Sequence, residues 1–220
     1  MTVDHLISDA TPPLRPGDTV EYALGLLMEL RVRHLPVVDE DKVVLGILSE
    51  DRLLDASSPD DRVLDLIDGR PIVAGNEDHV FEVSRLMMEH NLTIVPVVKG
   101  DAYIGLVRRH DLFEWFARSL STHAPGAILA LEVKPRDYSL SRLIHAIEQT
   151  DVRVLSVGTE QPGTVDDHIH VTVKINVRDA SRARAMLERE GYRVVAAFGE
   201  EEDEQDLADR VQAFMRYLEV

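Results

Sequence analysis

The sequence predicts an α/β (α+β) protein built from two kinds of unit, and three observations lead to this prediction. The first is an internal repeat that makes residues 1–60 and 61–120 two copies of one module. The second is the order of apolar patterns over residues 126–199, which changes between strand and helix periods as βαββαβ. The third is the polar segment 119–126, which is typical of a linker. Residues 200–220 add an acidic run and a C-terminal helix with one apolar stripe.

A shift of the chain by 60 residues aligns the two copies. The aligned positions include Leu6 with Leu66, Ile7 with Ile67, Asp18 with Asp78, Leu26 with Leu86 and Pro36-Val37-Val38 with Pro96-Val97-Val98. One later turn is a residue shorter in the second copy, so Gly46 then matches Gly105. Because one copy alone would expose too much apolar surface, we expect the two to pack as a single unit.

Each copy is expected to contain a helix, two strands and a short second helix. In the first copy, Asp18 is the expected N-cap of the first helix, with Glu21 placed to complete a capping box. The strands are expected at 35–38 and 43–48, and Ser49 opens the second helix. The elements expected in the second copy are a helix over 80–89, strands over 94–98 and 102–107, and a helix over 109–117.

The remainder of the chain has a different order of elements. We expect strands over 127–133, 152–157, 169–177 and 192–198, a helix around 140–147, and a helix that is capped by Asp179 and runs to 190. This βαββαβ order is the ferredoxin-like arrangement.

The composition excludes several classes of partner and chemistry. The chain of 220 residues has a formal net charge of −16, so its surface repels phosphate backbones and anionic lipids, and we expect neither nucleic acid nor membrane as a partner. An anionic metabolite would need a local basic patch. The absence of cysteine excludes disulfides and thiolate chemistry. The N-terminal residues lack a signal-peptide pattern and no apolar run is long enough to span a membrane, so we expect a cytoplasmic protein.

Four short motifs in the two copies resemble the CBS repeat. They are Leu-Pro-Val-Val at 35–38, Gly-Ile-Leu-Ser at 46–49, Val-Pro-Val-Val at 95–98 and Gly-Leu-Val-Arg at 105–108. The resemblance covers residues 4 to about 118. It implies that the two repeats form a compact Bateman module, often dimeric, with clefts that bind adenine nucleotides or related ligands. The regulatory ligands that it suggests are AMP, ADP, ATP and S-adenosylmethionine, and no cofactor is required.

In nucleotide-binding members of that family, Ser or Thr follows the strand glycine by three residues and Asp follows it by six. A carboxylate at the latter position can accept hydrogen bonds from both ribose hydroxyls. The first copy keeps Ser49 but has Arg52 in place of the Asp, whereas the second copy keeps Asp111 but has Arg108 in place of the hydroxyl residue. Each copy therefore retains half of the signature.

Two interpretations of the second copy stay open. In one, Asp111 holds a ribose while Arg108, Arg109 or His110 contacts phosphate near a helix N-terminus. In the other, Asp111 only caps the helix or pairs locally. In the first copy, Ser49 is interpreted as an ordinary helix cap. The predicted ligand-binding residues are Asp111, Arg108, Arg109, Val95, Ile67 and Ser49.

The βαββαβ unit, attached to a regulatory module, resembles an ACT domain over residues 127–199. Effector-binding ACT domains usually carry a glycine in the loop after the first strand, and here that loop (135–138) has none. A structural or dimerising role is favoured over ligand binding for this reason. Two CBS repeats followed by an ACT-like domain resemble the acetoin-utilisation accessory family, which implies a metabolic regulatory role.

The sequence favours a non-catalytic regulator over an enzyme. His168 and His170 share one face of a strand beside Asp166 and Asp167, but a solvated strand face is the favoured interpretation of these residues over a metal site. No nucleophile motif or phosphate-binding glycine loop is found. We expect a homodimer that binds a small-molecule effector and regulates a metabolic enzyme. The alternative is a ligand-free assembly or dimerisation protein that scaffolds a metabolic partner.

Overall fold

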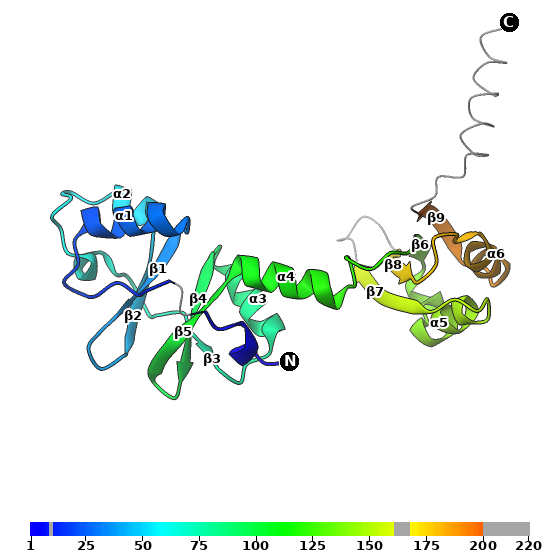
Figure 1. Cartoon of the computed structure of the whole chain (residues 1–220), viewed down its shortest axis with the longest axis horizontal. Helices are drawn as coiled ribbons and strands as arrows, with labels where there is room; N and C mark the ends of the chain where they lie inside the picture. Colours follow the sequence, from blue (N-terminus) through cyan, green and yellow to red (C-terminus); the bar gives the residue numbers. More distant parts are fainter. Residues whose placement is uncertain (9–10, 161–167, 200–220) are drawn as a thin grey trace, which may run out of the picture. The chain divides into compact units, whose positions relative to one another are not determined.

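The computed structural model describes residues 1–8, 11–160 and 168–199. The chain divides into two compact units, residues 1–115 and 116–220 (Figure 1). Among the described residues, the first unit contains two clusters of buried apolar side chains, one for each repeat, and the second unit contains one. Helices and strands are mixed in both units, as the predicted α+β class requires.

The first repeat has the predicted order of helix, hairpin and short helix. After the 3-10 helix η1 (Val3–Leu6), its elements are α1 (Val20–Leu30), β1 (His34–Val38), β2 (Val44–Ser49) and α2 (Glu50–Leu54). Strands β1 and β2 are antiparallel. Helix α2 begins as predicted, because the Ser49 hydroxyl accepts a hydrogen bond from the Arg52 amide at 3.1 Å.

The prediction that Asp18 caps α1 was wrong. Thr19 is the N-cap, and its hydroxyl accepts from the Tyr22 amide at 3.2 Å. The Asp18 carboxylate instead accepts from the Arg15 amide at 2.7 Å, which closes the turn before the helix. Both residues are good caps by type, and only the backbone path decides which one stands at the helix start.

The second repeat follows the same order, with one additional short strand. Its elements are the 3-10 helix η2 (Val63–Leu66), β3 (Ala74–Gly75), α3 (Val80–Glu89), β4 (Ile94–Lys99), β5 (Ala102–Arg108) and α4 (Arg109–Ser119). The bounds predicted for α3 are confirmed, and α4 runs past its predicted end at residue 117. Strand β3 is parallel to β4, and β5 is antiparallel to it.

The two repeats exchange their N-terminal segments. Val3 and Leu6 of η1 lie in the core of the second repeat, whereas Val63 of η2 lies in the core of the first. The backbone hydrogen bonds of the exchange obey the repeat offset. The Val3 amide donates to the Asp78 carbonyl at 2.9 Å, and the Val63 amide donates to the Asp18 carbonyl at 3.0 Å. Each repeat therefore completes the fold of the other.

Two glycines make room for the exchanged segments. A Cβ atom built on Gly46 would lie 2.6 Å from Cγ2 of Ile67, and one built on Gly105 would overlap the Ile7 side chain. Gly105 also has φ +144°, a conformation that residues with a side chain rarely adopt. The glycine in each repeated strand motif is thus required by close packing of the crossing segment.

The second unit has the predicted ferredoxin-like arrangement. Its elements are β6 (Ile128–Val133), the 3-10 helix η3 (Pro135–Asp137), α5 (Leu140–Glu148), β7 (Val154–Glu160), β8 (Ile169–Ile175), α6 (Ser181–Arg189) and β9 (Arg193–Phe198). The strand order is β7-β8-β6-β9, and all neighbouring strands are antiparallel. The predicted helix over residues 200–220 lies outside the described residues.

The inward face of β8 and the two helices form the core of the second unit. Val171 and Val173 alternate with less buried residues along β8 and pack in one cluster with Leu143, Ile147 and Leu187 of α5 and α6. The ferredoxin-like order is confirmed by these pairings, while the resemblance to an ACT domain stays a prediction.

The start of α6 and the predicted linker differ in detail from the sequence pattern. Ala180 is the N-cap residue of α6, and Asp179 lies one residue earlier, where its carboxylate accepts from the Ser181 amide at 2.8 Å. In the linker 119–126, the Leu120 carbonyl accepts a hydrogen bond from the Ser156 hydroxyl at 2.8 Å. That segment is therefore bound to β7, and the domain boundaries at residues 60, 120 and 126 stay predictions.

Gly105→Ala should lower the free energy of unfolding of the first unit by about 2 kcal/mol, because the new methyl group would displace Ile7 and would strain a positive φ. The single tryptophan, Trp115, lies in the first unit, so urea denaturation followed by its fluorescence measures this change.

Gly25→Ala is the matched control for Gly105→Ala. Gly25 is inside α1 with nothing near its missing Cβ atom, so this variant should gain about 0.5–1 kcal/mol of stability. Equal stability of the two variants would contradict the role assigned to Gly105.

Candidate functional site

A cavity of about 270 Å³ lies in the first unit, and both repeats line it. The lining residues are Arg33, His34, Ser49, Glu50, Asp51, His90, Asn91, Thr93 and Arg109. We call it the inter-repeat cavity. Two of the predicted ligand-binding residues, Ser49 of the first repeat and Arg109 of the second, are brought together here.

The same backbone contact fixes the wall of the cavity in both repeats. The amide of Glu50, at the start of α2, donates to the Arg33 carbonyl at 2.9 Å. The amide of Arg109, at the start of α4, donates to the Thr93 carbonyl at 2.9 Å. Each bond joins the first residue of a helix to the residue immediately before the first strand of the hairpin in the same repeat. The two helix starts are therefore held at equivalent positions around the cavity.

A polar contact joins the repeats inside the cavity. The Thr93 amide donates to Nδ1 of His34 at 3.3 Å, and the Thr93 hydroxyl lies 2.8 Å from the same nitrogen. Because an amide can only donate, Nδ1 accepts and the imidazole is neutral. Burial lowers the pKa of His34, and the positive charges of Arg109 and Arg33 lower it further.

The arginines of the cavity have unequal partners. Arg33 forms ion pairs with Glu50 at 3.3 Å and with Asp51 at 3.6 Å. Arg109 donates from Nε to the Leu92 carbonyl at 3.1 Å, and within the described part of the chain its contacts are with uncharged oxygens of Leu92 and Asn91. Its positive charge is therefore not balanced by a bound carboxylate. The carboxylates of Glu50 and Asp51 make the lining formally neutral, but both pair with Arg33, so the Arg109 guanidinium is the group in the cavity that can bind an anion.

Asp111 and Arg108 do not line this cavity and form an ion pair with each other. Nε and one terminal nitrogen of Arg108 each donate to Asp111, both at 2.8 Å. The Asp111 side chain is only 18% exposed, and its hydrogen bond raises the pKa of Arg108. The carboxylate predicted to hold a ribose is thus occupied by the arginine three residues before it.

Val95 and Ile67, which were also predicted to bind ligand, and Arg52, which replaces the signature Asp, have structural contacts. Val95 is fully buried in the core of the second repeat, and Ile67 packs over Gly46. Arg52 donates from Nε to the Leu66 carbonyl at 3.2 Å and forms an ion pair with Asp68. The arginine that replaces the ribose-binding Asp therefore holds the exchanged segment in place.

The sequence interpretation missed His34, Arg33 and Thr93. The 60-residue offset pairs Arg33 with Thr93 and His34 with Ile94, so the two copies differ where the cavity forms. A search for polar differences between otherwise similar copies would have drawn attention to these positions.

The candidate metal ligands around His168 and His170 are only partly described. Among the residues described, no group of three or more His, Asp or Glu could hold a metal ion. Asp166 and Asp167, which lie beside His168 in the sequence, fall outside the described residues. In the described ranges, no helix is both long enough and apolar enough to cross a membrane.

Comparison with known families gives a direct match in the first half of the chain. The family model described as CBS domain matches twice, at residues 3–59 and 63–118. A homoserine O-acetyltransferase of Methanobrevibacter ruminantium is 28% identical over 100 residues, which are 45% of this chain and 20% of that protein. This chain therefore spans about a fifth of the length of that relative.

Two solved structures share the fold. A CBS domain pair/ACT domain protein from Thermotoga maritima has a TM-score of 0.50 at 23% identity and matches 55% of this chain and 99% of its own. An acetoin utilization protein from Vibrio cholerae also has a TM-score of 0.50 at 23% identity, with 56% of this chain and 95% of its own covered. At these identities the likeness concerns the fold alone.

Protonation of His34 should destabilise the first unit. Its pKa in the folded state is below the usual value of 6.5, so the unfolded chain binds a proton more readily. The contribution of His34 to stability is complete above pH 6.5 and is lost as the pH falls from 6.5 through the lowered folded pKa. Urea denaturation of the wild type at pH 7.5 and 5.5 should show this loss.

His34→Asn should remove the part of the pH dependence that belongs to His34, because the amide oxygen can accept from Thr93 but does not titrate. His5→Asn replaces an exposed imidazole and should leave the pH dependence unchanged. NMR titration of the His34 ring would contradict the assignment if it gave a pKa at or above 6.5.

Proposed function

This chain belongs to the CBS-domain family, and from that premise we propose that it is a non-catalytic regulatory protein that binds an adenosine-containing metabolite between its two repeats. The observation that carries the proposal is the inter-repeat cavity, to which both repeats contribute and in which Arg109 has no carboxylate partner within the described residues. A phosphate group would supply the missing negative charge and could accept the hydrogen bonds of the guanidinium.

The charge of the cavity discriminates between the expected ligands. AMP, ADP and ATP carry phosphate, whereas S-adenosylmethionine carries a sulfonium cation. Arg109 has no carboxylate partner among the described residues, so it would attract the phosphate of a nucleotide, whereas a sulfonium group would gain no contact with it. We therefore propose a phosphorylated adenosine compound rather than S-adenosylmethionine as the effector.

Asp111 lies outside the inter-repeat cavity, so a ligand bound to Arg109 would reach it only by extending along the start of α4, and there the ion pair between Arg108 and Asp111 would be a barrier to ribose binding. Asp111 can accept from ribose hydroxyls only after Arg108 releases it, because the arginine occupies both carboxylate oxygens. An ion pair that is partly exposed contributes about 1 kcal/mol or less, so a ligand can replace it at modest cost. The effector would then exchange one charged partner of Asp111 for two neutral hydroxyl groups.

Exposed apolar side chains favour a second function, assembly into a homodimer. Met28 on α1 and Met88 on α3 are 78% and 84% exposed, and they are equivalent under the repeat offset. Leu54 after β2 and Phe113 after β5 are a second equivalent pair, 64% and 70% exposed. Because each repeat exposes equivalent apolar side chains, these residues suit a two-fold interface with another copy of the chain. Assembly without ligand is the alternative function if both clefts are empty in solution.

A metabolic enzyme is the class of partner that we propose for the regulator. In Methanobrevibacter ruminantium, the segment similar to this chain is part of a much longer protein named as an acetyltransferase. A separate chain could control such an enzyme by association. We propose the cytoplasm as its location, with which the absence of cysteine is compatible.

Asp111→Asn should weaken the binding of AMP by roughly 10- to 150-fold, because a charge-assisted hydrogen bond to the ribose is worth about 1.5–3 kcal/mol. Arg108→Gln should leave the affinity unchanged or raise it, because it frees the carboxylate of Asp111. Isothermal titration calorimetry of the full chain measures both effects.

Arg109→Gln and Asp101→Asn complete this experiment. Arg109→Gln should weaken AMP but not adenosine, because only AMP carries phosphate. Asp101→Asn removes an exposed carboxylate in the β4–β5 turn and should change neither affinity. If the wild type binds no adenosine compound, the ligand-sensing function is wrong and the assembly function stands.

The wild type should be a dimer, and the double variant Met28→Glu/Met88→Glu should dissociate it, because buried carboxylates would replace apolar contacts. Light scattering should then fall from about twice the mass of one 24.7 kDa chain to that of one chain. Val43→Glu changes an exposed residue of the β1–β2 turn and should keep the dimer. A wild-type mass of one chain would disprove the dimer.

A further inference from the structure

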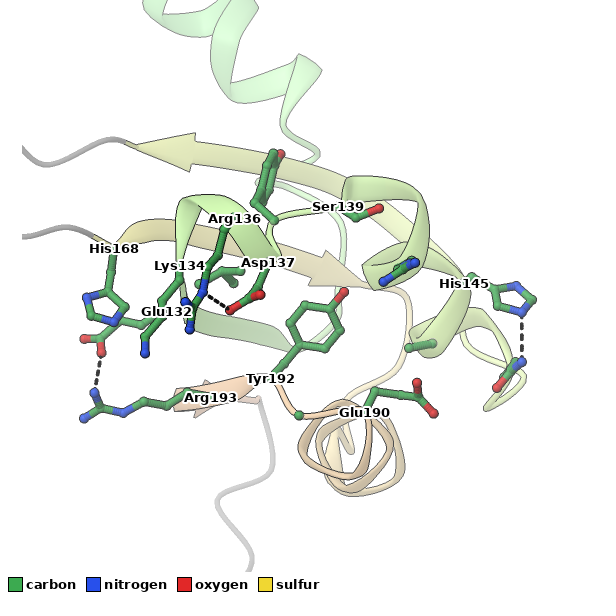
Figure 2. A pocket seen from close by; sticks show the side chains of 16 residues that line it. Glu132, Lys134, Arg136, Asp137, Ser139, His145, His168, Glu190, Tyr192 and Arg193 are labelled. Carbon is green, nitrogen blue, oxygen red and sulfur yellow. Dashed lines mark hydrogen bonds and ion pairs between the residues drawn. The ribbon is translucent and has the colours of Figure 1, made fainter.

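A larger cavity, of about 1190 Å³, lies within the second unit (Figure 2). It is bounded by the end of β6, the 3-10 helix η3, one side of α5 and the segment between α6 and β9. We call it the β6–α5 cavity. In Figure 2, labelled side chains from each of these segments surround the same space, with the Tyr192 ring in its middle.

Charged side chains dominate the lining. The cations are Lys134, Arg136, Arg142 and Arg193, and the carboxylates are Glu132, Asp137 and Glu190. Two of the carboxylates already have arginine partners, as Figure 2 shows. Arg193 pairs with Glu132 at 2.7 Å, and Arg136 pairs with Asp137 at 3.5 Å. These pairs leave Lys134, Arg142 and the carboxylate of Glu190 without an ion-pair partner among the residues that the structure describes, which is an excess of one positive charge.

The environment of Tyr192 shows that the free charges act in this space. Burial raises the pKa of Tyr192, the positive charge of Arg142 lowers it, and the negative charge of Glu190 raises it. Arg142, on α5, is therefore close enough to Tyr192 to interact with its hydroxyl group electrostatically. The phenol can donate a hydrogen bond to the same group that Arg142 attracts.

The position of this cluster matters because the whole chain is acidic. With a net charge of −16, most of the surface repels small anions. The excess of cations in this cavity is thus a local exception. It provides the basic patch that an anionic metabolite would need on so acidic a protein. The cations are largely exposed, so they can rearrange around a ligand at low cost.

We propose that the β6–α5 cavity is a second ligand site, which takes a small organic polyanion that carries phosphate or several carboxylates. Lys134 and Arg142 bind the anionic groups, and the Tyr192 hydroxyl donates a hydrogen bond. The volume is sufficient for a metabolite-sized ligand. The proposal is independent of ligand binding by the CBS repeats, because all of its residues lie in the second unit.

The site can be tested by calorimetry of the full chain with pyrophosphate and citrate, which carry no adenosine, and with glycerol as a neutral probe. At low ionic strength, pyrophosphate, citrate or both should bind, glycerol should not, and added salt should weaken the affinity. Binding of pyrophosphate alone would identify a phosphate ligand, and binding of citrate alone a polycarboxylate. NMR shifts of the Gly191 and Tyr192 amides should change on binding.

Lys134→Gln and Arg142→Gln should each weaken binding by roughly tenfold. Arg153→Gln is the matched control, because it removes the same charge from an exposed residue outside the cavity. An equal loss in all three variants would show general charge attraction only and would overturn the proposal.

The CBS repeats provide the second control. Asp111→Asn, in the first unit, should leave the binding of pyrophosphate and citrate unchanged. Loss of binding in Asp111→Asn, with none in the Lys134 and Arg142 variants, would place the anion in the first unit. No binding of either anion would also overturn the proposal. Neither result bears on the binding of AMP.

Discussion

The exchange of N-terminal segments between the repeats is the contact on which the first unit depends. Ile7 packs against Gly105 and Ile67 packs against Gly46, so each strand glycine contacts the N-terminal segment of the other repeat. A side chain at either glycine would push the crossing segment away from the strand. Val3, Leu6 and Val63 would then leave the cores that they complete, and neither repeat would have a full core of its own.

The inter-repeat cavity follows from this packing. Once the repeats are interlocked, the starts of α2 and α4 both line the cavity, and equivalent backbone bonds to Arg33 and Thr93 fix each start within its own repeat. The hydrogen bond from Thr93 to His34 then crosses between repeats in a half-buried position, where an unsatisfied polar group would be costly. This contact places a neutral imidazole in the cavity beside Arg109, whose hydrogen bonds go to uncharged oxygens of Leu92 and Asn91.

Several carboxylates of this acidic protein are paired with arginines, and this pairing determines which cations stay available to bind an anionic ligand. Asp111 is held by Arg108, Glu132 by Arg193 and Asp137 by Arg136. Such pairs lower the local negative charge and leave selected cations free. In each unit one described cation without a carboxylate partner lies at a cavity, Arg109 in the first and Arg142 in the second. A small anion is the ligand class that both cavities favour.

The sequence alone determined the duplication, the order of elements and several bounds, including α3 at Val80–Glu89 and the Ser49 cap of α2. It could do so because apolar periodicity and capping chemistry depend on residues close together in the chain. It also located the strand glycines, although not the reason for them. Only the tertiary structure decided that Arg108 occupies Asp111 and that His34 meets Thr93 across 59 residues. Rotamer choice decides the first contact and packing between repeats the second, and neither leaves a period in the sequence.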